Sequence, residues 1–209
     1  MAVVSLYDKY VLPRVINCAC GSKTFMKQRA LVVPQATGVV LEVGIGTGLN
    51  LPFYDSKVVD RVIGLDPSLE SWKLAARRMQ AVDFEVEFIG LPEEGIPLEP
   101  ESVDTVLVTF SLCTIPDPLA ALRSLQRVLR AGGKLIFCEH GRSPDLNVFK
   151  WQNRLNGVWG SLAGGCHLNR DIPGLIQESG FAIEEIDTRY LTSTARFASF
   201  VFWGVASLG

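Results

Sequence analysis

The chain lacks a hydrophobic run that could cross a membrane. Its longest charge-free apolar stretch, residues 197–209, is shorter than the roughly 20 residues that a spanning helix needs. Near the start, Asp8, Lys9 and Arg14 interrupt any apolar segment that could act as a secretory signal. We therefore expect a cytoplasmic protein without an integral membrane segment. A peripheral contact with a membrane is compatible with this expectation.

An excess of charge of one sign is also missing. Lysine and arginine number 20 against 22 aspartates and glutamates, so the formal net charge is −2. Proteins that bind nucleic acids usually carry a strongly basic surface, and the only basic cluster here lies within residues 1–37. We therefore expect the partner to be a small molecule and not a nucleic acid.

Cysteine is scarce and follows no ligand pattern. The five cysteines include no C-x-x-C pair, which argues against a secreted disulfide framework and for free thiols in a reducing compartment. Cys18 and Cys20 form a C-x-C, and only Cys166 otherwise stands near a histidine, so we expect no metal ligands. We interpret Cys113 as a buried packing thiol.

Strand and helix patterns alternate along most of the chain. Asp117 and Pro118 are typical of a helix start, and Gly132 with Gly133 of its end, with leucines 119, 122, 125 and 129 on one face between them. The alternation predicts an α/β sandwich with a mainly parallel sheet. Strands are expected over residues 39–43, 61–66, 84–88, 103–110 and 134–139.

Both ends of the chain depart from this alternation. Residues 181–189 and 194–205 have strand character with no helix between them, which predicts an antiparallel hairpin. Residues 1–37 have a helical and amphipathic pattern. We therefore expect an N-terminal helical lid over residues 1–37 and one α/β domain over residues 38–209.

Glycines cluster directly after the first predicted strand. Gly44, Gly46 and Gly48 follow Glu42 at alternate positions, where they let the chain turn sharply and let a ligand lie against bare backbone. We expect a helix to follow, with free N–H groups for a carboxylate or phosphate. The spacing is G-x-G-x-G, whereas NAD sites have G-x-G-x-x-G, and no P-loop G-K-[ST] occurs.

A second candidate ligand group ends the next predicted strand. Asp66 stands 24 positions after Glu42, where an acid can accept two hydrogen bonds from the ribose diol of an adenosine-containing cofactor. Alternatively, Asp66 caps the helix that begins after Pro67 and Ser68.

Four segments together resemble the class I S-adenosylmethionine-dependent methyltransferases. They are E-V-G-I-G-T-G at 42–48, G-L-D-P-S at 64–68, E-S-V-D-T-V at 101–106 and L-R-A-G-G-K-L at 129–135. The resemblance implies a Rossmann-like three-layer α/β sandwich. Its seven-stranded, mostly parallel sheet would have the order 3-2-1-4-5-7-6 with strand 7 antiparallel, in agreement with the terminal hairpin.

A narrower resemblance is to the methyltransferase-like-seven group and its bacterial relatives. It is carried by T-F-S-L-C-T-I at 109–115, E-H at 139–140, W-Q at 151–152 and G-C-H-L-N-R at 165–170. Members of that group are thought to methylate small thiols, and their wider kin act on quinol precursors and phospholipid headgroups. The resemblance implies an enzyme (EC 2.1.1.-) that transfers a methyl group from S-adenosyl-L-methionine to a small, hydrophobic thiol, quinol or amine headgroup and releases S-adenosyl-L-homocysteine.

The resemblance also implies cofactor contacts. Glu42 and the glycine loop would face the methionine part, and Asp66 would hold the ribose. Leu91 stands where the family often has an acid that binds the adenine amino group, so that contact would fall to Glu93 or to a backbone carbonyl. Thr109 and Phe110 would stand where the methyl donor meets its acceptor, and Arg29 would pair with the methionine carboxylate. The implied contacts are Arg29, Glu42, Gly44, Gly46, Gly48, Asn50, Asp66, Pro67, Ser68, Gly90, Leu91, Pro92, Glu93, Thr109 and Phe110.

The two histidines are the candidate catalytic groups. His140 directly follows the fifth predicted strand, where it would act as a base or orient the acceptor; the alternative is a hydrogen-bonded structural residue. His167, with Asn169 and Arg170, would bind an anionic part of the acceptor, unless this segment only leads into a helix capped by Asp171.

Two other functions stay open at this point. One is a nicotinamide-dependent oxidoreductase on a similar frame, against which the glycine spacing and the terminal hairpin argue. The other is a non-catalytic module that binds the cofactor without turnover.

Overall fold

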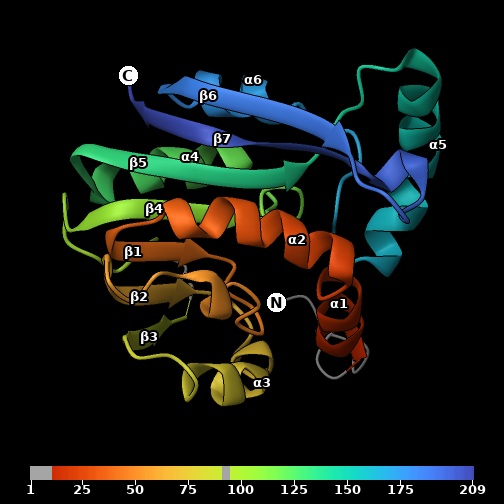
Figure 1. Ribbon diagram of the computed structural model, residues 1–209. Coiled ribbons are helices and arrows are strands. Elements are labelled where there is room, and N and C mark those ends of the chain that lie inside the picture. Colours follow the sequence, from red (N-terminus) through yellow and green to blue (C-terminus); the bar gives the residue numbers. More distant parts are fainter. Residues whose placement is uncertain (1–10, 91–94) are drawn as a thin grey trace.

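A seven-stranded sheet runs through the computed structural model, which describes residues 11–90 and 95–209 (Figure 1). The strand order is β3-β2-β1-β4-β5-β7-β6. Neighbouring strands are parallel from β3 to β5, whereas β7 is antiparallel to both β5 and β6. The expected Rossmann-like α/β fold and strand order are therefore confirmed. The strands are β1 (Gly38–Val43), β2 (Val59–Leu65), β3 (Glu85–Ile89), β4 (Val103–Thr109), β5 (Leu129–His140), β6 (Phe181–Tyr190) and β7 (Phe200–Leu208).

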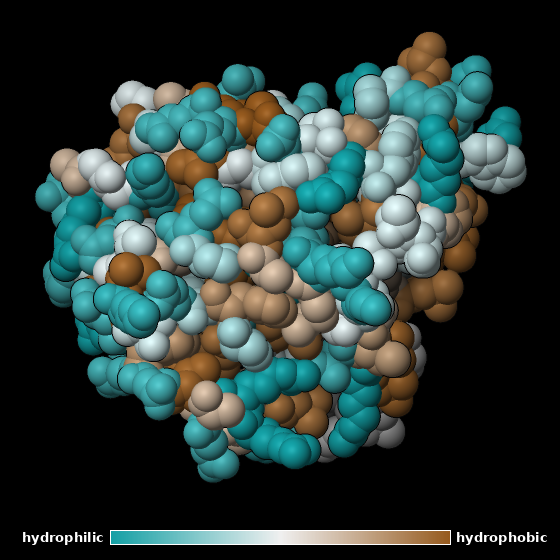
Figure 2. All heavy atoms as spheres, viewed as in Figure 1, coloured by the Kyte–Doolittle hydropathy of each residue, from teal (hydrophilic) through white to brown (hydrophobic). Residues whose placement is uncertain are grey.

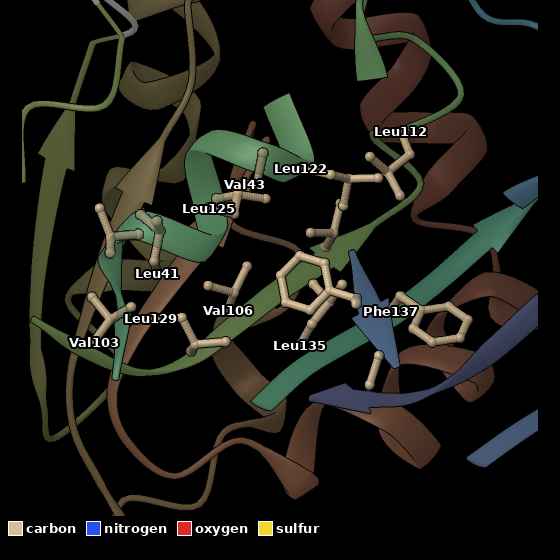
Figure 3. Packing of buried hydrophobic residues seen from close by; sticks show 14 of the residues in the cluster. Leu41, Val43, Val103, Val106, Leu112, Leu122, Leu125, Leu129, Leu135 and Phe137 are labelled. Carbon is tan, nitrogen blue, oxygen red and sulfur yellow. The ribbon is translucent and has the colours of Figure 1, made fainter. Parts of the chain in front are cut away.

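Helices cover both faces of the sheet. Because side chains alternate along a strand, Val106 of β4 joins one apolar cluster, with Leu122 and Leu125, and its neighbour Leu107 joins another, with Val32. Figure 3 shows the first cluster, in which Leu122 and Leu125 pack toward Val106 and Phe137. The helices are α1 (Leu12–Cys20), α2 (Lys23–Val32), α3 (Leu69–Met79), α4 (Pro118–Val128), α5 (Leu146–Leu162) and α6 (Ile172–Glu178).

Two helices, α1 and α5, lie beyond the carboxyl ends of the parallel strands (Figure 1). Thr47 of the glycine loop donates a hydrogen bond from its hydroxyl to Asn17 Oδ1 of α1 at 2.7 Å, which ties this helix to the end of β1. The helical character expected for residues 1–37 is confirmed for α1 and α2, residues 1–10 lie outside the described part, and the lid role stays a prediction. None of the described helices is long and apolar enough to span a membrane.

The helix expected directly after the glycine loop is wrong. Residues 44–50 form turns that lead into the single-turn 3₁₀ helix η3 (Leu51–Phe53). Glycines in the left-handed region, with φ of 53° at Gly46 and 72° at Gly48, interrupt a right-handed helix, and Pro52 supplies no N–H. The loop therefore presents turn backbone to a ligand and not an α-helix N-terminus.

Two other expected boundaries also differ. Helix α4 ends at Val128, and Leu129, expected on the helical face, has an extended backbone and pairs with Val103 as the first residue of β5. The Leu129 side chain is fully buried in the core, as the amphipathic pattern also required. Strand β7 begins at Phe200 and not at residue 194, because residues 191–199 form a loop with the 3₁₀ helix η4 (Arg196–Ala198).

Candidate functional site

The glycine loop needs glycine for two different reasons. Gly44 has a φ of 73°, and a Cβ there would lie 2.2 Å from Ser111 Oγ, so a side chain would push the loop after β4 away. At Gly46 the added Cβ would meet no atom closer than 3.8 Å, which leaves a bare backbone face open. The second reason is the backbone conformation of Gly46, whose φ of 53° favours glycine. In this conformation the Gly46 N–H donates a hydrogen bond to Asp66 Oδ2 at 2.8 Å.

Asp66 joins the glycine loop to the start of α3. Its Oδ2 accepts from Gly46 and its Oδ1 accepts from the Ser68 N–H, also at 2.8 Å. Burial raises the pKa of the Asp66 carboxyl, and these two hydrogen bonds lower it in part. The helix cap is Ser68, whose Oγ accepts from Ser71 N–H at 3.1 Å. A carboxylate has about four acceptor positions, so Asp66 keeps capacity for hydroxyl donors of a ligand.

Glu42 anchors a buried polar network at the end of β1. Asn50 donates from Nδ2 to Glu42 Oε1 at 2.9 Å, and the Tyr54 hydroxyl donates to Glu42 Oε2 at 2.7 Å. Burial raises the pKa of Glu42 to about 7, against the lowering effect of Tyr54, Arg29 and Asn50. The carboxyl group therefore changes its charge near neutral pH.

Arg29 of α2 closes this network from above the sheet. Its Nη1 donates to Asn50 Oδ1 at 2.6 Å and to Thr109 Oγ1 at 2.8 Å. The side chain is only 5% exposed, yet Nε has no hydrogen-bond partner among the described residues. A buried donor without a partner is costly, and an anionic ligand group such as the carboxylate of a methionine moiety would satisfy it.

Phe110 follows Thr109 in the chain and contacts two side chains of α2. It has a φ of 54°, a conformation that costs energy for a residue other than glycine and gathers at functional sites. Its ring contacts Phe25 edge-on, with ring centroids 4.9 Å apart, and lies 5.2 Å from the Arg29 guanidinium carbon. The predicted residues Arg29, Glu42, Asn50, Thr109 and Phe110 therefore come together at one place.

The segment expected to contact adenine is only partly described. Gly90 is exposed after β3, where an added Cβ would meet no atom within 4 Å, and Pro67 is exposed after β2. Leu91, Pro92 and Glu93 lie outside the described residues.

His140 ends β5 next to two thiols. Its Nε2 lies 3.3 Å from Cys166 Sγ, and Cys113 completes a group whose ligand atoms all lie within 4.8 Å of one another. Burial lowers the pKa of His140, but the hydrogen bond to Cys166 and the charges of Cys166 and Glu139 raise it more. The sequence led us to expect no metal ligands. The structure nevertheless brings two cysteines and one histidine together in a group that their spacing in the sequence did not reveal.

The groups around His167 are occupied by the protein itself. Arg170 donates from Nη1 to the backbone carbonyls of Leu112 and Ile115, and its Nη2 lies 3.2 Å from His167 Nδ1. Asp171 caps α6 by accepting from the Gly174 N–H at 3.2 Å. This supports the helix-cap interpretation of the segment.

Sequence reasoning missed Tyr54 and Glu139. Tyr54 lies in an irregular loop without a periodic signal, so the sequence did not show that its hydroxyl is buried and needs a hydrogen-bond partner. Glu139 lies in the E-H pair and accepts the N–H groups of Ser111, Leu112 and Cys113 at 2.6, 3.0 and 3.3 Å. It shapes the loop after β4 and holds Cys113 in place.

The chain is similar to known methyltransferases. Residues 41–137, which run from within β1 to within β5, match a family described as a methyltransferase domain. The chain is 31% identical over 152 residues to the thiol S-methyltransferase TMT1B of Rattus norvegicus, covering 71% of this chain and 62% of that protein. It is 35% identical over 154 residues to the demethylmenaquinone methyltransferase of Renibacterium salmoninarum, again covering 71% and 62%.

A solved structure reproduces the fold. A SAM-dependent methyltransferase from Thermotoga maritima superposes with a TM-score of 0.68 at 21% identity, covering 96% of this chain and 99% of that one. The strand order and these matches define the class to which the chain is similar, the class I S-adenosylmethionine-dependent methyltransferases. Within that class its sequence is similar to the thiol S-methyltransferases and to bacterial menaquinone methyltransferases, and it spans about 60% of their length.

Proposed function

We propose that the protein transfers a methyl group from S-adenosylmethionine to a small, hydrophobic acceptor, with a thiol as the first candidate. The observation that carries the proposal is the Arg29–Asn50–Glu42 network at the end of β1, which leaves one buried N–H donor unused. The matched thiol and menaquinone methyltransferases support the reaction class.

The methionine end of the donor is assigned to the residues around β1. Arg29 Nε–H would donate to the α-carboxylate, and Glu42, when ionised, would attract the α-ammonium group. Asn50 and Thr109 keep the Arg29 side chain in place through hydrogen bonds of 2.6 and 2.8 Å. Gly44 and Gly48 would let the loop backbone follow the ligand.

The adenosine end is assigned to the residues after β2 and β3. Asp66 would accept the ribose hydroxyls with the acceptor positions that Gly46 and Ser68 leave over. Pro67 and Ser68 would flank the adenine on one side and Gly90 on the other. Leu91, Pro92 and Glu93 belong to the same proposed contact, with Glu93 as the candidate for the adenine amino group.

Methyl transfer from a sulfonium is an in-line displacement on an already activated carbon, which the bound donor supplies. The chain contributes alignment and exclusion of water. Phe110, locked against Phe25 and Arg29, would form the wall between donor and acceptor. His140 is the proposed residue on the acceptor side, because it ends β5 next to the loop after β4.

A hydrophobic acceptor is supported by the apolar surface at this end of the sheet. Helix α1 exposes Val15 and Ile16, and α5 exposes Trp151, Val158 and Leu162. Figure 2 shows hydrophilic side chains over most of this face, with apolar side chains gathered at the side where Figure 1 places α1 and α5. The same surface is compatible with a peripheral contact to a lipid phase.

The test is transfer of labelled methyl from S-adenosylmethionine to a panel of hydrophobic thiols, quinols and amine headgroups. We expect label on the thiols, with one S-adenosylhomocysteine released for each methyl transferred. Label on quinols or amines alone would show that the acceptor is one of these classes and not a thiol. Binding of the donor without any transfer would favour the non-catalytic module, and absence of donor binding would end the proposal.

A further inference from the structure

Two thiols and one imidazole from three separate segments meet beside the proposed methyl-transfer site. Cys113 follows β4, His140 ends β5 and Cys166 lies between α5 and α6; all three are buried, and their ligand atoms lie within 4.8 Å of one another. Zinc bonds of about 2.3 Å to sulfur and about 2.0 Å to nitrogen place the donors of a tetrahedral site about 3.5–4 Å apart. The 3.3 Å between His140 Nε2 and Cys166 Sγ is close to that spacing.

Hydrogen bonds from outside the group hold its members in place. Glu139 binds the backbone N–H of Cys113, and the Cys113 carbonyl accepts from the His167 N–H at 2.8 Å, which links the two cysteine loops. Trp159 donates from Nε1 to Cys166 Sγ at 3.3 Å. Such outer hydrogen bonds orient the ligands of a metal site.

The group lies next to the cofactor loop. Ser111, two residues before Cys113, packs so closely on Gly44 that a Cβ at Gly44 would come within 2.2 Å of its Oγ. Thr109, a member of the Arg29 network, is two residues further back. A ligand bound to Cys113, His140 and Cys166 would therefore be held at the same carboxyl-end edge of β4 and β5 as the proposed methyl donor.

We propose that Cys113, His140 and Cys166 bind one Zn²⁺ and that its fourth position takes the sulfur of a thiol acceptor. The second half of this inference rests on the proposed function, because it needs a methyl donor next to the metal. Two thiolates with one imidazole are a donor set that zinc favours. Among the described residues no fourth cysteine, histidine, aspartate or glutamate joins the group, and three-ligand zinc sites keep a position for a substrate.

The charges and atoms balance. On metal binding the two cysteines release two protons to solvent, so the site with its Zn²⁺ is neutral. The acceptor thiol releases its own proton to solvent and binds as a thiolate, which is the reactive form of sulfur. Its sulfur then forms a bond to the methyl carbon while the methyl–sulfonium bond breaks and leaves its electron pair on the donor sulfur. The products are a methyl thioether and S-adenosylhomocysteine.

Arg170 compensates the extra negative charge of a bound thiolate. Its guanidinium interacts electrostatically with Cys113 and Cys166, and its hydrogen bonds to the Leu112 and Ile115 carbonyls hold it beside the loop after β4. In this arrangement His140 acts as a metal ligand and not as a base, because the metal and not the imidazole makes the acceptor a thiolate.

The first test is the metal content of the full-length protein purified without chelators, measured by elemental mass spectrometry. We expect about one zinc per chain in the wild type and in Cys18→Ser, which changes an exposed thiol outside the group. Cys113→Ser and Cys166→Ser should each lower zinc roughly tenfold or more. Trp159→Phe keeps all three ligands and should weaken zinc affinity by roughly 10- to 100-fold, which tests the site without removing a ligand. Circular dichroism checks that each variant is folded.

The second test replaces zinc with cobalt. Two thiolate ligands should give a thiolate-to-cobalt charge-transfer absorption, and a hydrophobic thiol should change the cobalt d–d bands if it enters the fourth position. An unchanged spectrum, with methyl transfer to the same thiol intact, would refute the acceptor role.

Two results would overturn the metal site itself: no bound zinc or cobalt in a folded wild type, or a Cys113–Cys166 disulfide in the protein as isolated. Zinc content does not depend on S-adenosylmethionine. A protein that binds zinc but not the methyl donor would therefore contradict the proposed function and leave the metal site standing.

Discussion

At the scale of single residues, Glu42 gives the site a dependence on pH. Its pKa is raised from 4.5 to about 7, chiefly by burial. The folded state keeps this proton up to about pH 7, whereas the unfolded chain releases it near pH 4.5. Between these values the folded state binds more protons, so the contribution of Glu42 to stability falls as the pH rises.

Glu42→Gln should remove this dependence. We expect the free energy of unfolding of the wild type to lose up to about 1.4 kcal/mol per pH unit relative to the variant between pH 5 and about pH 7. Urea denaturation of both proteins at three pH values in this window measures the difference. Parallel pH profiles for the two proteins would show that Glu42 is ionised in the folded state throughout.

Asp66 is the residue on which adenosine binding depends most directly. Asp66→Ala removes the proposed ribose acceptor and should weaken S-adenosylmethionine binding by more than roughly tenfold. The matched control is Asp60→Ala, which changes an exposed acid at the opposite end of the same strand. Calorimetric titration measures both, and equal affinities for the two variants would take Asp66 out of the site.

At the scale of elements, α2 matters because it carries Arg29 and Phe25 to the ends of the strands. Arg29→Lys keeps a positive charge but loses the planar group that binds Asn50 and Thr109 while leaving Nε free. We expect roughly tenfold weaker donor binding, with Lys27→Ala on the exposed face of the same helix as the control. An Arg29→Lys variant that binds as the wild type does would refute the proposed carboxylate contact.

The strands were predictable because their signals are local. The apolar run 39–43 and the glycines after it identify β1 and its loop without any knowledge of the rest of the chain. The end of α4 was not predictable in this way, since Leu129 fits both the last turn of an amphipathic helix and the start of a buried strand. Its pairing with Val103 decides between them, and that partner is distant in the sequence.

The site residues also divide into those with a local sequence signal and those without one. Glu42, Gly46 and Asp66 stand at recognisable positions after strands, whereas Tyr54 lies in a loop without a pattern. The Cys113–His140–Cys166 group arises only because the topology sets β4 beside β5 and returns the α5–α6 loop to their ends. The spacing of these three residues in the sequence does not predict that they lie close together.

At the scale of the whole molecule, two apolar clusters hold the sheet and its helices together, and Figure 3 shows one of them. Leu122→Ala removes a fully buried side chain from the cluster between α4 and the sheet and should lower the free energy of unfolding by about 2–5 kcal/mol. Leu146→Ala, at a position that is 71% exposed, should change it by less than about 0.5 kcal/mol. Equal effects in denaturant titrations would contradict the packing described for α4.

The measurement that tests the central claim most directly is calorimetric titration of the purified chain with S-adenosylmethionine and, separately, with NADH. We expect binding of about one S-adenosylmethionine per chain, competition by S-adenosylhomocysteine and no binding of NADH. Binding of NADH, or no binding of S-adenosylmethionine to the folded protein, would contradict the central claim.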